Sequence, residues 1–310
     1  MKELKIHFLN TIWSDAILLE NNNHYAFVDS GSKFYYPMIQ DHLTQYNINK
    51  IDFIILTHFH SDHYGNVEAI INDYEVGKIY LKHFYGLDGI TSSGFESNEE
   101  YIENEFKQYH KIIEACNKRN VEIIYLDEIK SDTLTINFEN IDIELYDIKN
   151  TIYDIYNDSS SPYYNQKRFS ENYNSIGIFI KINNNTIFLG GDVTCSKSDI
   201  LELNGLSIKM INKIYDKYQI SNIDIYKSCH HGGSGTNTLD LCNLLKTKYA
   251  IITNTARWLD HYSTFDNLRS GNKDVKILPT DFQKYIFKIN DKIDYEVIKE
   301  TSLFITLGKN

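Results

Sequence analysis

The segment 50–63, which reads KIDFIILTHFHSDH, constrains the fold of this 310-residue chain more than any other segment. Its run FIIL is apolar on both faces, which is typical of a strand buried between two layers. Directly after it come three histidines and one aspartate in the order His-x-His-x-Asp-His. A surface loop that is His-rich by chance is the weaker interpretation of four ligand-type residues in this order. The segment therefore predicts a metal site at the edge of a buried sheet.

The spacing within this cluster predicts two adjacent metal positions. Residues two apart on an extended segment face the same way, so His58 and His60 are expected to present their rings to one point. Asp62 and His63 follow where the chain turns into the next helix, and they are expected to reach a second point nearby. Imidazole with carboxylate suits Zn²⁺, and also Mn²⁺ or Fe. We therefore expect two metal ions, with zinc as the first choice.

One cluster cannot complete two coordination shells, and ligand-type residues follow two later strands. The motif IFLGGDV places Asp192 after an apolar run, where the preceding glycines leave its carboxylate clear to bridge two cations. The motif IYKSCHHGG places His230 and His231 at the end of another strand. Each motif alone is weak, since Gly-Asp is common in turns. Together with the first cluster they predict a two-metal site built from strand ends.

Three neighbouring residues have competing interpretations. Asp29, in FVDSG, either belongs to a simple turn with Gly31 or accepts a hydrogen bond that orients a ligand histidine, and we favour the second. Lys227 is interpreted as part of a solvated loop rather than as a neighbour of the metals. Cys229 is interpreted as a buried thiol at a strand end rather than as a sulfur ligand.

The order of patterns along the chain predicts an α/β fold. Short β patterns dominate the first third, and NNNH at 21–24 is typical of a hairpin turn. Apolar residues at spacings of three and four predict a helix over 99–118. A polar segment from 149 to about 172 is expected to form a long loop on the rim. Two mostly β halves with outer helices predict a four-layer αββα sandwich, formed by a single domain over 1–310.

Composition and charge disfavour several classes of function. The net charge of −11 disfavours unspecific binding to nucleic acid, which relies on neutralisation of phosphates by Lys and Arg. No apolar stretch approaches the length of a membrane span, and the N-terminal MKELKIHFLNTIW lacks the apolar core of a signal peptide. The four cysteines form no CxxC motif and are expected to be reduced. We therefore expect a soluble cytoplasmic protein without nucleic-acid or membrane partners.

The motifs VDSG, THFHSDH, GGDV and HHGG, in this order, resemble those of the metallo-β-lactamase superfamily. The resemblance implies an αββα sandwich with a dinuclear site, usually of zinc, at one edge. It also implies a role for each matching residue, with either His230 or His231 left open as the ligand. By resemblance, metal one is bound by His58 and His60, metal two by Asp62, His63 and His231, and both by the bridging Asp192, while Asp62 and His230 also take part in catalysis.

One departure from the superfamily pattern is informative. Most branches supply a third histidine to metal one before the bridging aspartate, but no histidine lies between His110 and His230 here. The corresponding place reads ENYNSIGIF, which resembles the branch of competence-protein hydrolase domains and phosphorylcholine esterases. The resemblance implies a catalytic role for Asn174 and a supporting role behind the ligands for Ser175. It is closest to the phosphorylcholine esterase catalytic module and weakens around 87–172, which we expect to be a variable rim insertion.

The expected function is hydrolysis of a phosphodiester by a hydroxide that bridges two metal ions. The expected substrate is a small or choline-type phosphodiester, including one derived from a cell wall. Choline recognition needs aromatic rings around a quaternary ammonium. The candidate rings are Trp13, Tyr85, Tyr163, Tyr164 and Trp258. Two alternatives stay open: a competence-type nuclease and a metal-binding module without activity.

Overall fold

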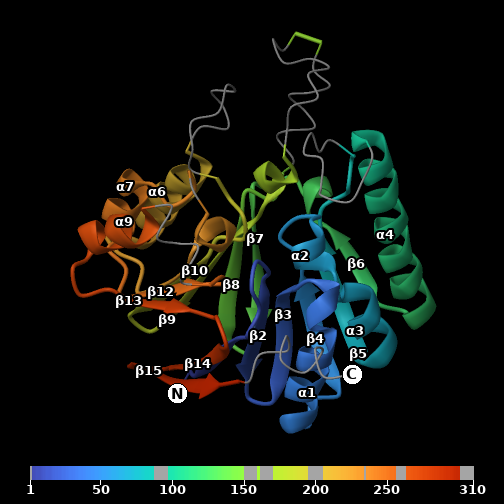
Figure 1. The fold of residues 1–310 in the computed structure, drawn as a ribbon, viewed down its shortest axis with the longest axis horizontal. Helices are drawn as coiled ribbons and strands as arrows, with labels where there is room; N and C mark the ends of the chain where they lie inside the picture. Colours follow the sequence, from blue (N-terminus) through green and yellow to red (C-terminus); the bar gives the residue numbers. More distant parts are fainter. Residues whose placement is uncertain are drawn as a thin grey trace.

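The computed structural model describes residues 2–86, 97–149, 159–160, 170–194, 205–233, 235–255 and 263–300. These residues form two β-sheets that pack face to face, with helices on the outside of each (Figure 1). The structure therefore confirms the predicted αββα sandwich.

The first sheet contains eight strands, and its centre carries the histidine cluster. Its spatial order is β15 (Ile293–Lys299), β14 (Gln283–Ile289), β1 (Leu4–Phe8), β2 (Ala16–Asn21), β3 (His24–Ser30), β4 (Lys50–Ile55), β5 (Glu75–Leu81) and β6 (Glu122–Tyr125). Strands β3 to β6 are parallel, so their carboxyl ends reach the same edge of the sheet. Asn22 and Asn23 join β2 to β3 with φ of 50° and 63°, which is the two-residue hairpin predicted there.

The second sheet contains seven strands and carries the downstream motifs. Its spatial order is β13 (Lys276–Pro279), β12 (Tyr249–Ile252), β11 (Ile225–Lys227), β10 (Asn185–Leu189), β9 (Gly177–Ile182), β8 (Ile141–Tyr146) and β7 (Thr133–Phe138). Strands β10 to β13 are parallel, and β10 and β11 end next to each other at Leu189 and Lys227. The GGD and HHGG motifs therefore leave the sheet at one edge.

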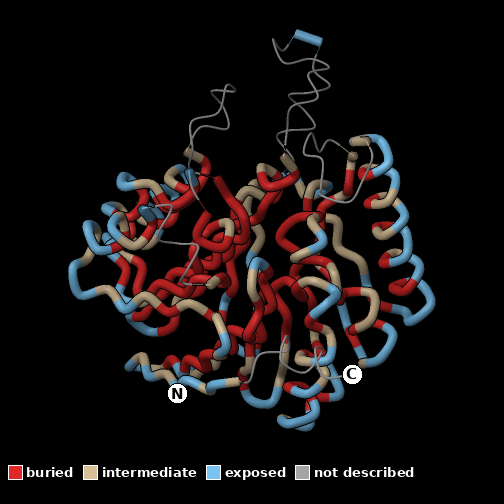
Figure 2. Tube along the Cα trace, viewed as in Figure 1, coloured by how far each residue is buried: buried red, intermediate tan, exposed pale blue. Residues whose placement is uncertain are grey.

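Three buried clusters hold the layers together, as the continuous red in the interior of Figure 2 shows. The middle cluster joins the inner faces of the two sheets. The other two lie between each sheet and its helices. The helices on the first sheet are α1 (Tyr36–Gln45), α3 (Val67–Asp73) and α4 (Asn98–Arg119), and those on the second are α6 (Leu206–Tyr218), α7 (Leu239–Leu245) and α9 (Thr264–Gly271).

Helix α4 confirms the helix predicted over 99–118, and local chemistry sets its ends. The Ser97 hydroxyl accepts a hydrogen bond from the Glu100 amide at the N-terminus. Lys118 and Arg119 lie in the last turn, where positive charge interacts favourably with the helix dipole. Asn120 ends the helix in the left-handed conformation, with φ of 57°.

The range 87–172 contains more of the framework than a rim insertion would. Within it, α4 and β6 belong to the first layer pair, and β7 and β8 belong to the second sheet. Of the loop expected over 149–172, residues 150–158 and 161–169 lie outside the described part. Its end, Glu171–Asn174, forms a short 3-10 helix, η3.

Candidate metal centre

The candidate ligands meet where strands of both sheets end. The loop after β4 carries His58 and His60, and the short helix α2 (Ser61–Tyr64) carries Asp62 and His63. Asp192 follows β10, and His231 lies in η5 (Cys229–Gly232) after β11. The site thus combines one edge of each sheet, as the motif order predicts.

Four of these side chains converge on one point, which we call position two. His231 Nε2 lies 3.0 Å from Asp62 Oδ2 and 3.6 Å from Asp192 Oδ2. His63 Nε2 lies 3.3 Å from Asp192 Oδ1 and 3.7 Å from Asp62 Oδ2. Two imidazole nitrogens and two carboxylates at such distances form a donor set suited to a divalent cation.

A second group, position one, shares the Asp192 carboxylate. His58 Nε2 lies 3.1 Å from His60 Nδ1 and 3.8 Å from Asp192 Oδ2. These three residues offer ligand atoms that all lie within 4.8 Å of one another. Asp192 is therefore placed between the two groups, where the sequence predicts a bridging ligand.

Each buried ring has its Nδ1 engaged by a residue behind it. His63 Nδ1 lies 2.7 Å from Asp29 Oδ2, and Asp29 also accepts hydrogen bonds from the amide and hydroxyl of Thr57. His58 Nδ1 lies 3.1 Å from Thr57 Oγ1. An acceptor at Nδ1 fixes the tautomer and leaves Nε2 for a metal. Asp29 thus lies where its orienting role was predicted.

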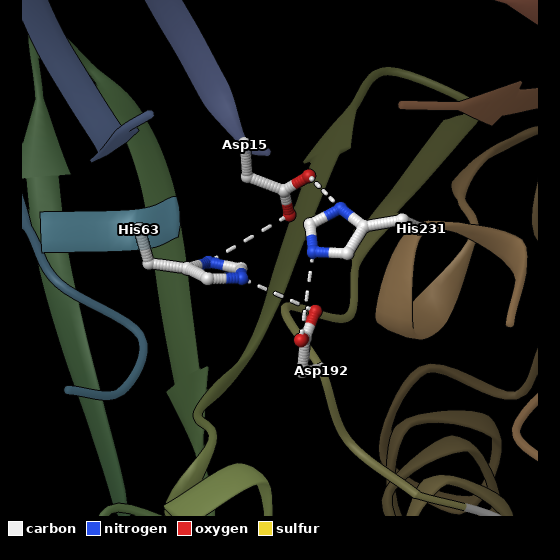
Figure 3. A group of neighbouring side chains, drawn as sticks. All are labelled: Asp15, His63, Asp192 and His231. Atoms are coloured by element: carbon white, nitrogen blue, oxygen red, sulfur yellow. Dashed lines mark ion pairs between the residues drawn. The ribbon is translucent and has the colours of Figure 1, made fainter. Parts of the chain in front are cut away.

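Asp15 is a member of the centre that sequence reasoning missed. Its Oδ1 lies 3.2 Å from His231 Nδ1 and accepts a hydrogen bond from Thr253 Oγ1 at 2.6 Å. Figure 3 shows Asp15 and Asp192 on opposite sides of the His63 and His231 rings. Because Asp15 faces the Nδ1 side, we interpret it as an orienting acceptor rather than a ligand. The signal that could have identified Asp15 is its position directly before β2. The next residue, Ala16, pairs with Ser30, and this pairing brings Asp15 close to Asp29.

Lys227 corrects a second expectation. It was expected in a solvated loop, but it ends β11 with a fully buried side chain. Its ammonium forms an ion pair with Asp15 and donates a hydrogen bond to the Gly191 carbonyl at 3.1 Å. Its Nζ also lies 3.9 Å from Asp192 Oδ1. The expectation is wrong because a buried carboxylate recruits a buried cation, and this pairing is invisible locally.

The charge balance of the centre calls for added cations. Among the described residues, the carboxylates of Asp15, Asp29 and Asp192 are buried and that of Asp62 is partly buried, whereas the ammonium that contacts them is that of Lys227. Within the described residues, His63 Nε2 and Asp192 Oδ1 are buried without a hydrogen-bond partner. Buried carboxylates without compensating positive charge are strongly unfavourable. The donor set therefore fits divalent metal ions.

Without metal, protons bind in place of the cations. Burial lowers the pKa of His231, but the nearby Asp192 and Asp15 carboxylates outweigh it and raise the pKa to about 9. For His63, burial is likewise outweighed by the carboxylates of Asp192, Asp29 and Asp62, so its pKa lies well above the ordinary value. The same rings hold the pKa of Asp192 well below its usual range, although burial alone would raise it. Metal binding has to displace these protons.

This linkage predicts opposite pH dependences for metal affinity and metal-free stability. Zn²⁺ affinity is expected to fall as pH falls from about 9, by about tenfold per pH unit for each displaced proton. The metal-free fold should be stabilised below pH 6.5 and lose that stabilisation as pH rises towards about 9. Titration calorimetry in buffers of different ionisation enthalpy would count the protons released. An affinity that is constant between pH 6.5 and 8.5 would contradict the linkage.

The two adjacent histidines of HHGG lie in different environments. The His231 side chain is 2% exposed with its Nε2 facing Asp62, whereas the His230 side chain is 42% exposed. His230 Nε2 lies 3.8 Å from Asp192 Oδ2. The structure therefore favours His231 as the ligand of position two and leaves His230 on the open side. Both residues have positive φ, 49° and 50°, a conformation that non-glycine residues adopt at a cost.

Helix η3 stands where the third histidine of other branches would be expected. The side-chain amide of Asn174 donates a hydrogen bond to Glu171 Oε2 at 2.9 Å, so its nitrogen is bonded within η3. Ser175 Oγ accepts a hydrogen bond from the Asp192 amide at 3.3 Å, which supports the bridging residue from behind. The amide that contacts a histidine of the centre is that of Asn172, with Nδ2 3.3 Å from His230 Nε2. The catalytic role of Asn174 stays a prediction.

The other predicted neighbours divide into two groups. Cys229 is buried, as predicted, and a Cβ on Gly190 would lie 2.4 Å from its Sγ, so this position of GGD excludes a side chain. The Tyr85 hydroxyl donates to Asp127 at 2.5 Å, and Trp13 is 38% exposed on the loop before Asp15. Tyr163, Tyr164 and Trp258 lie outside the described residues.

None of the helices in the described ranges is both long and apolar enough to cross a lipid bilayer.

Comparisons with known proteins agree with this fold. The family model described as the metallo-beta-lactamase superfamily matches residues 14–102. The metallo-beta-lactamase fold protein YhfI from Bacillus subtilis aligns with 93% of this chain and 100% of its own, at 13% identity and a TM-score of 0.51. The CmlA β-hydroxylase aligns with 93% of this chain and 54% of its own, at 12% identity and a TM-score of 0.49. A diphosphatase of the PhnP family aligns with 94% of this chain and 99% of its own, at 14% identity and a TM-score of 0.45.

No curated protein sequence matches the chain. At such identities, likeness to a solved structure bears on the fold alone. The family match includes the histidine cluster, and the two-sheet sandwich is similar in fold to YhfI. The narrower resemblance to phosphorylcholine esterases stays a prediction.

Proposed function

We propose that this protein is a dinuclear metal-dependent hydrolase that cleaves phosphodiesters, with zinc as the expected metal. The observation that supports this most is the position of Asp192, whose carboxylate faces imidazole nitrogens of both groups. His58 and His60 would hold one ion, and Asp62, His63 and His231 the other. When occupied, the site would supply Lewis-acid activation of a phosphoryl oxygen and a water acidic enough to provide the nucleophile.

The residues of the chain then have distinct tasks. Asp29 and Asp15 hold the His63 and His231 rings with Nε2 towards the centre. Lys227 compensates the charge of Asp15 and binds the Gly191 carbonyl, directly before Asp192. His230, on the exposed side, is placed to contact the substrate. No nucleophilic side chain is required, because the attacking group is derived from water.

A choline-type substituent is the finer part of the proposal. Trp13 is 38% exposed and has φ of 54°, an unusual conformation for a bulky residue. Its amide donates to the Thr253 carbonyl at 3.0 Å, and Thr253 in turn contacts Asp15 and His231. An exposed aromatic ring on the loop leading to Asp15 suits a cationic substituent on the substrate. A nuclease is less favoured because the chain carries a net charge of −11.

The proposal is tested by assaying the zinc-loaded protein on four substrates. These are bis-p-nitrophenyl phosphate, p-nitrophenyl phosphorylcholine, single-stranded DNA and a thioester. We expect both p-nitrophenyl diesters to be cleaved, with kcat/KM higher for the choline ester. Trp13→Ala is expected to raise KM for the choline ester by about 5–30-fold, which corresponds to about 1–2 kcal/mol for a cation–π contact.

Each outcome separates the parts of the proposal. Equal cleavage of the two diesters would contradict recognition of a choline substituent and would still support phosphodiesterase activity. Preferred cleavage of DNA would show that the substrate is nucleic acid and not a small phosphodiester. Absence of hydrolysis in the presence of two bound Zn²⁺ would favour a metal-binding module without activity.

A further inference from the structure

We propose that Asn172 is a positioning residue that acts on the reaction through His230. This inference rests on the proposed hydrolase function, and it concerns a residue that the resemblance leaves without a role. Its basis is the contact between Asn172 Nδ2 and His230 Nε2 at 3.3 Å, made on the side of the ring that faces Asp192.

The His230 ring needs an external restraint. Its backbone is fixed, since the His230 amide donates to the Gly191 carbonyl at 3.0 Å and its carbonyl accepts from the Gly233 amide. Its side chain, however, is 42% exposed, whereas those of His58 and His63 are 0% exposed. Packing therefore confines the two buried rings, but a half-open ring has room to change rotamer. The contact with Asn172 supplies the missing restraint.

Asn172 is itself held on a rigid support. Ser170 Oγ accepts a hydrogen bond from the Asn172 amide at 3.3 Å and so caps η3. The buried Lys82 donates to the carbonyl of Asn174 at 2.8 Å and ties η3 to the end of β5. Glu171 Oε1 lies 3.4 Å from the backbone amide of Phe59. In the sequence, Phe59 stands between His58 and His60, the two histidines of position one. Helix η3 is thus connected to the metal-binding loop and to the first sheet.

The Asn172 side chain is buried, and its amide is only partly hydrogen-bonded. The residue is 8% exposed, and within the described residues Oδ1 has no hydrogen-bond partner. Buried amides are normally fully bonded, because an unsatisfied polar atom is unfavourable. Nδ2 contacts His230, so the amide is oriented towards the ring.

The neighbouring Asn174 provides a matched control. It is the same residue type in the same helix, is buried, and also has an Oδ1 without a partner among the described residues. Its amide contacts Glu171 instead of His230. A purely structural contribution of η3 should therefore be shared by both asparagines, whereas an effect through His230 should belong to Asn172 alone.

The test is a double-mutant cycle on the zinc-loaded full chain. Asn172→Ala is expected to lower kcat by about 10–100-fold with little change in KM, as is usual for residues that orient a catalytic group. In a His230→Ala background the same change should have no further effect. Asn174→Ala should change kcat by the same factor in both backgrounds. A loss caused by Asn172→Ala that is equally large without His230 would overturn the proposal.

A second measurement does not depend on activity. In protein labelled with ¹⁵N-histidine, Asn172→Ala should shift or broaden the His230 Nε2 resonance and leave that of His58 in place. An unchanged His230 signal would overturn the positioning role even if activity fell. If the wild-type protein cleaves no phosphodiester, the proposed function fails, and this spectrum still decides whether Asn172 holds the ring.

Discussion

Replacing Asp192 by asparagine is expected to lower kcat/KM for phosphodiesters by about a thousandfold, or ~4 kcal/mol of transition-state stabilisation. Asp192 is the carboxylate that both groups of imidazoles share, and Asn keeps its size while removing its charge. The neutral amide cannot bridge two cations, so the pair should lose its spacing and at least one ion. Kinetics with the p-nitrophenyl diesters and metal analysis of the dialysed variant measure both effects.

The control for this variant is Asp216→Asn, which removes the same charge from the exposed face of α6. It should retain wild-type activity and metal content. The mechanism would be wrong if Asp192→Asn hydrolysed the diesters at the wild-type rate. Retention of two Zn²⁺ with loss of activity would instead show that the carboxylate acts on the bound water rather than on the metal content.

Lys227→Met is expected to destabilise the metal-free protein by about 3–5 kcal/mol, the usual cost of breaking a buried ion pair from one side. Lys227 is fully buried and pairs with Asp15, whose carboxylate is 1% exposed. Burial lowers the Lys227 pKa, but the Asp15 and Asp192 carboxylates raise it above its usual value. The ammonium is therefore charged in the fold, and methionine leaves Asp15 uncompensated. Urea denaturation in the presence of a chelator measures the loss.

Two further variants make this prediction specific. Lys273→Met, at an exposed lysine, should change stability by no more than about 0.5 kcal/mol. Adding Asp15→Asn to Lys227→Met removes the second charge and should recover part of the lost stability. Zn²⁺ affinity should not recover, because a neutral amide supports the His231 ring less strongly at Nδ1 than the Asp15 carboxylate does. Additive destabilisation by the two changes would show that the pair is not coupled.

The main features of the fold could be predicted because they depend on local patterns. The Asn22-Asn23 turn and the capped helix α4 are encoded by residues adjacent in sequence. Strands β4 and β10 follow from apolar runs that lead into ligand-type residues. The range 87–172 was harder to interpret, because α4, β6, β7 and β8 belong to different layers and no local pattern shows the layer to which an element belongs.

The site was predicted unevenly, for a similar reason. Asp29 and the ligand histidines stand in motifs that are recognisable one at a time. Asp15 and Lys227 stand in no recognisable motif. Their pairing becomes visible only in the fold, where the start of β2 lies close to the end of β11. The role in the centre was assigned to Asn174, whereas the contact with His230 belongs to Asn172, two positions earlier. Within η3 a shift of two residues changes the side of the helix, which the sequence pattern did not resolve.

The sequence by itself determined the kind of chemistry, because His58, His60, Asp62 and His63 are ligand-type residues gathered in one short segment. Only the tertiary structure decided which residues support them. Thr253 and Asp15, 238 residues apart, meet behind His231, and Asn172 meets His230 across 58 residues. Such pairs form where two sheets bring strand ends together. Their identity follows from packing and from the need to compensate buried charge, and neither leaves a local pattern.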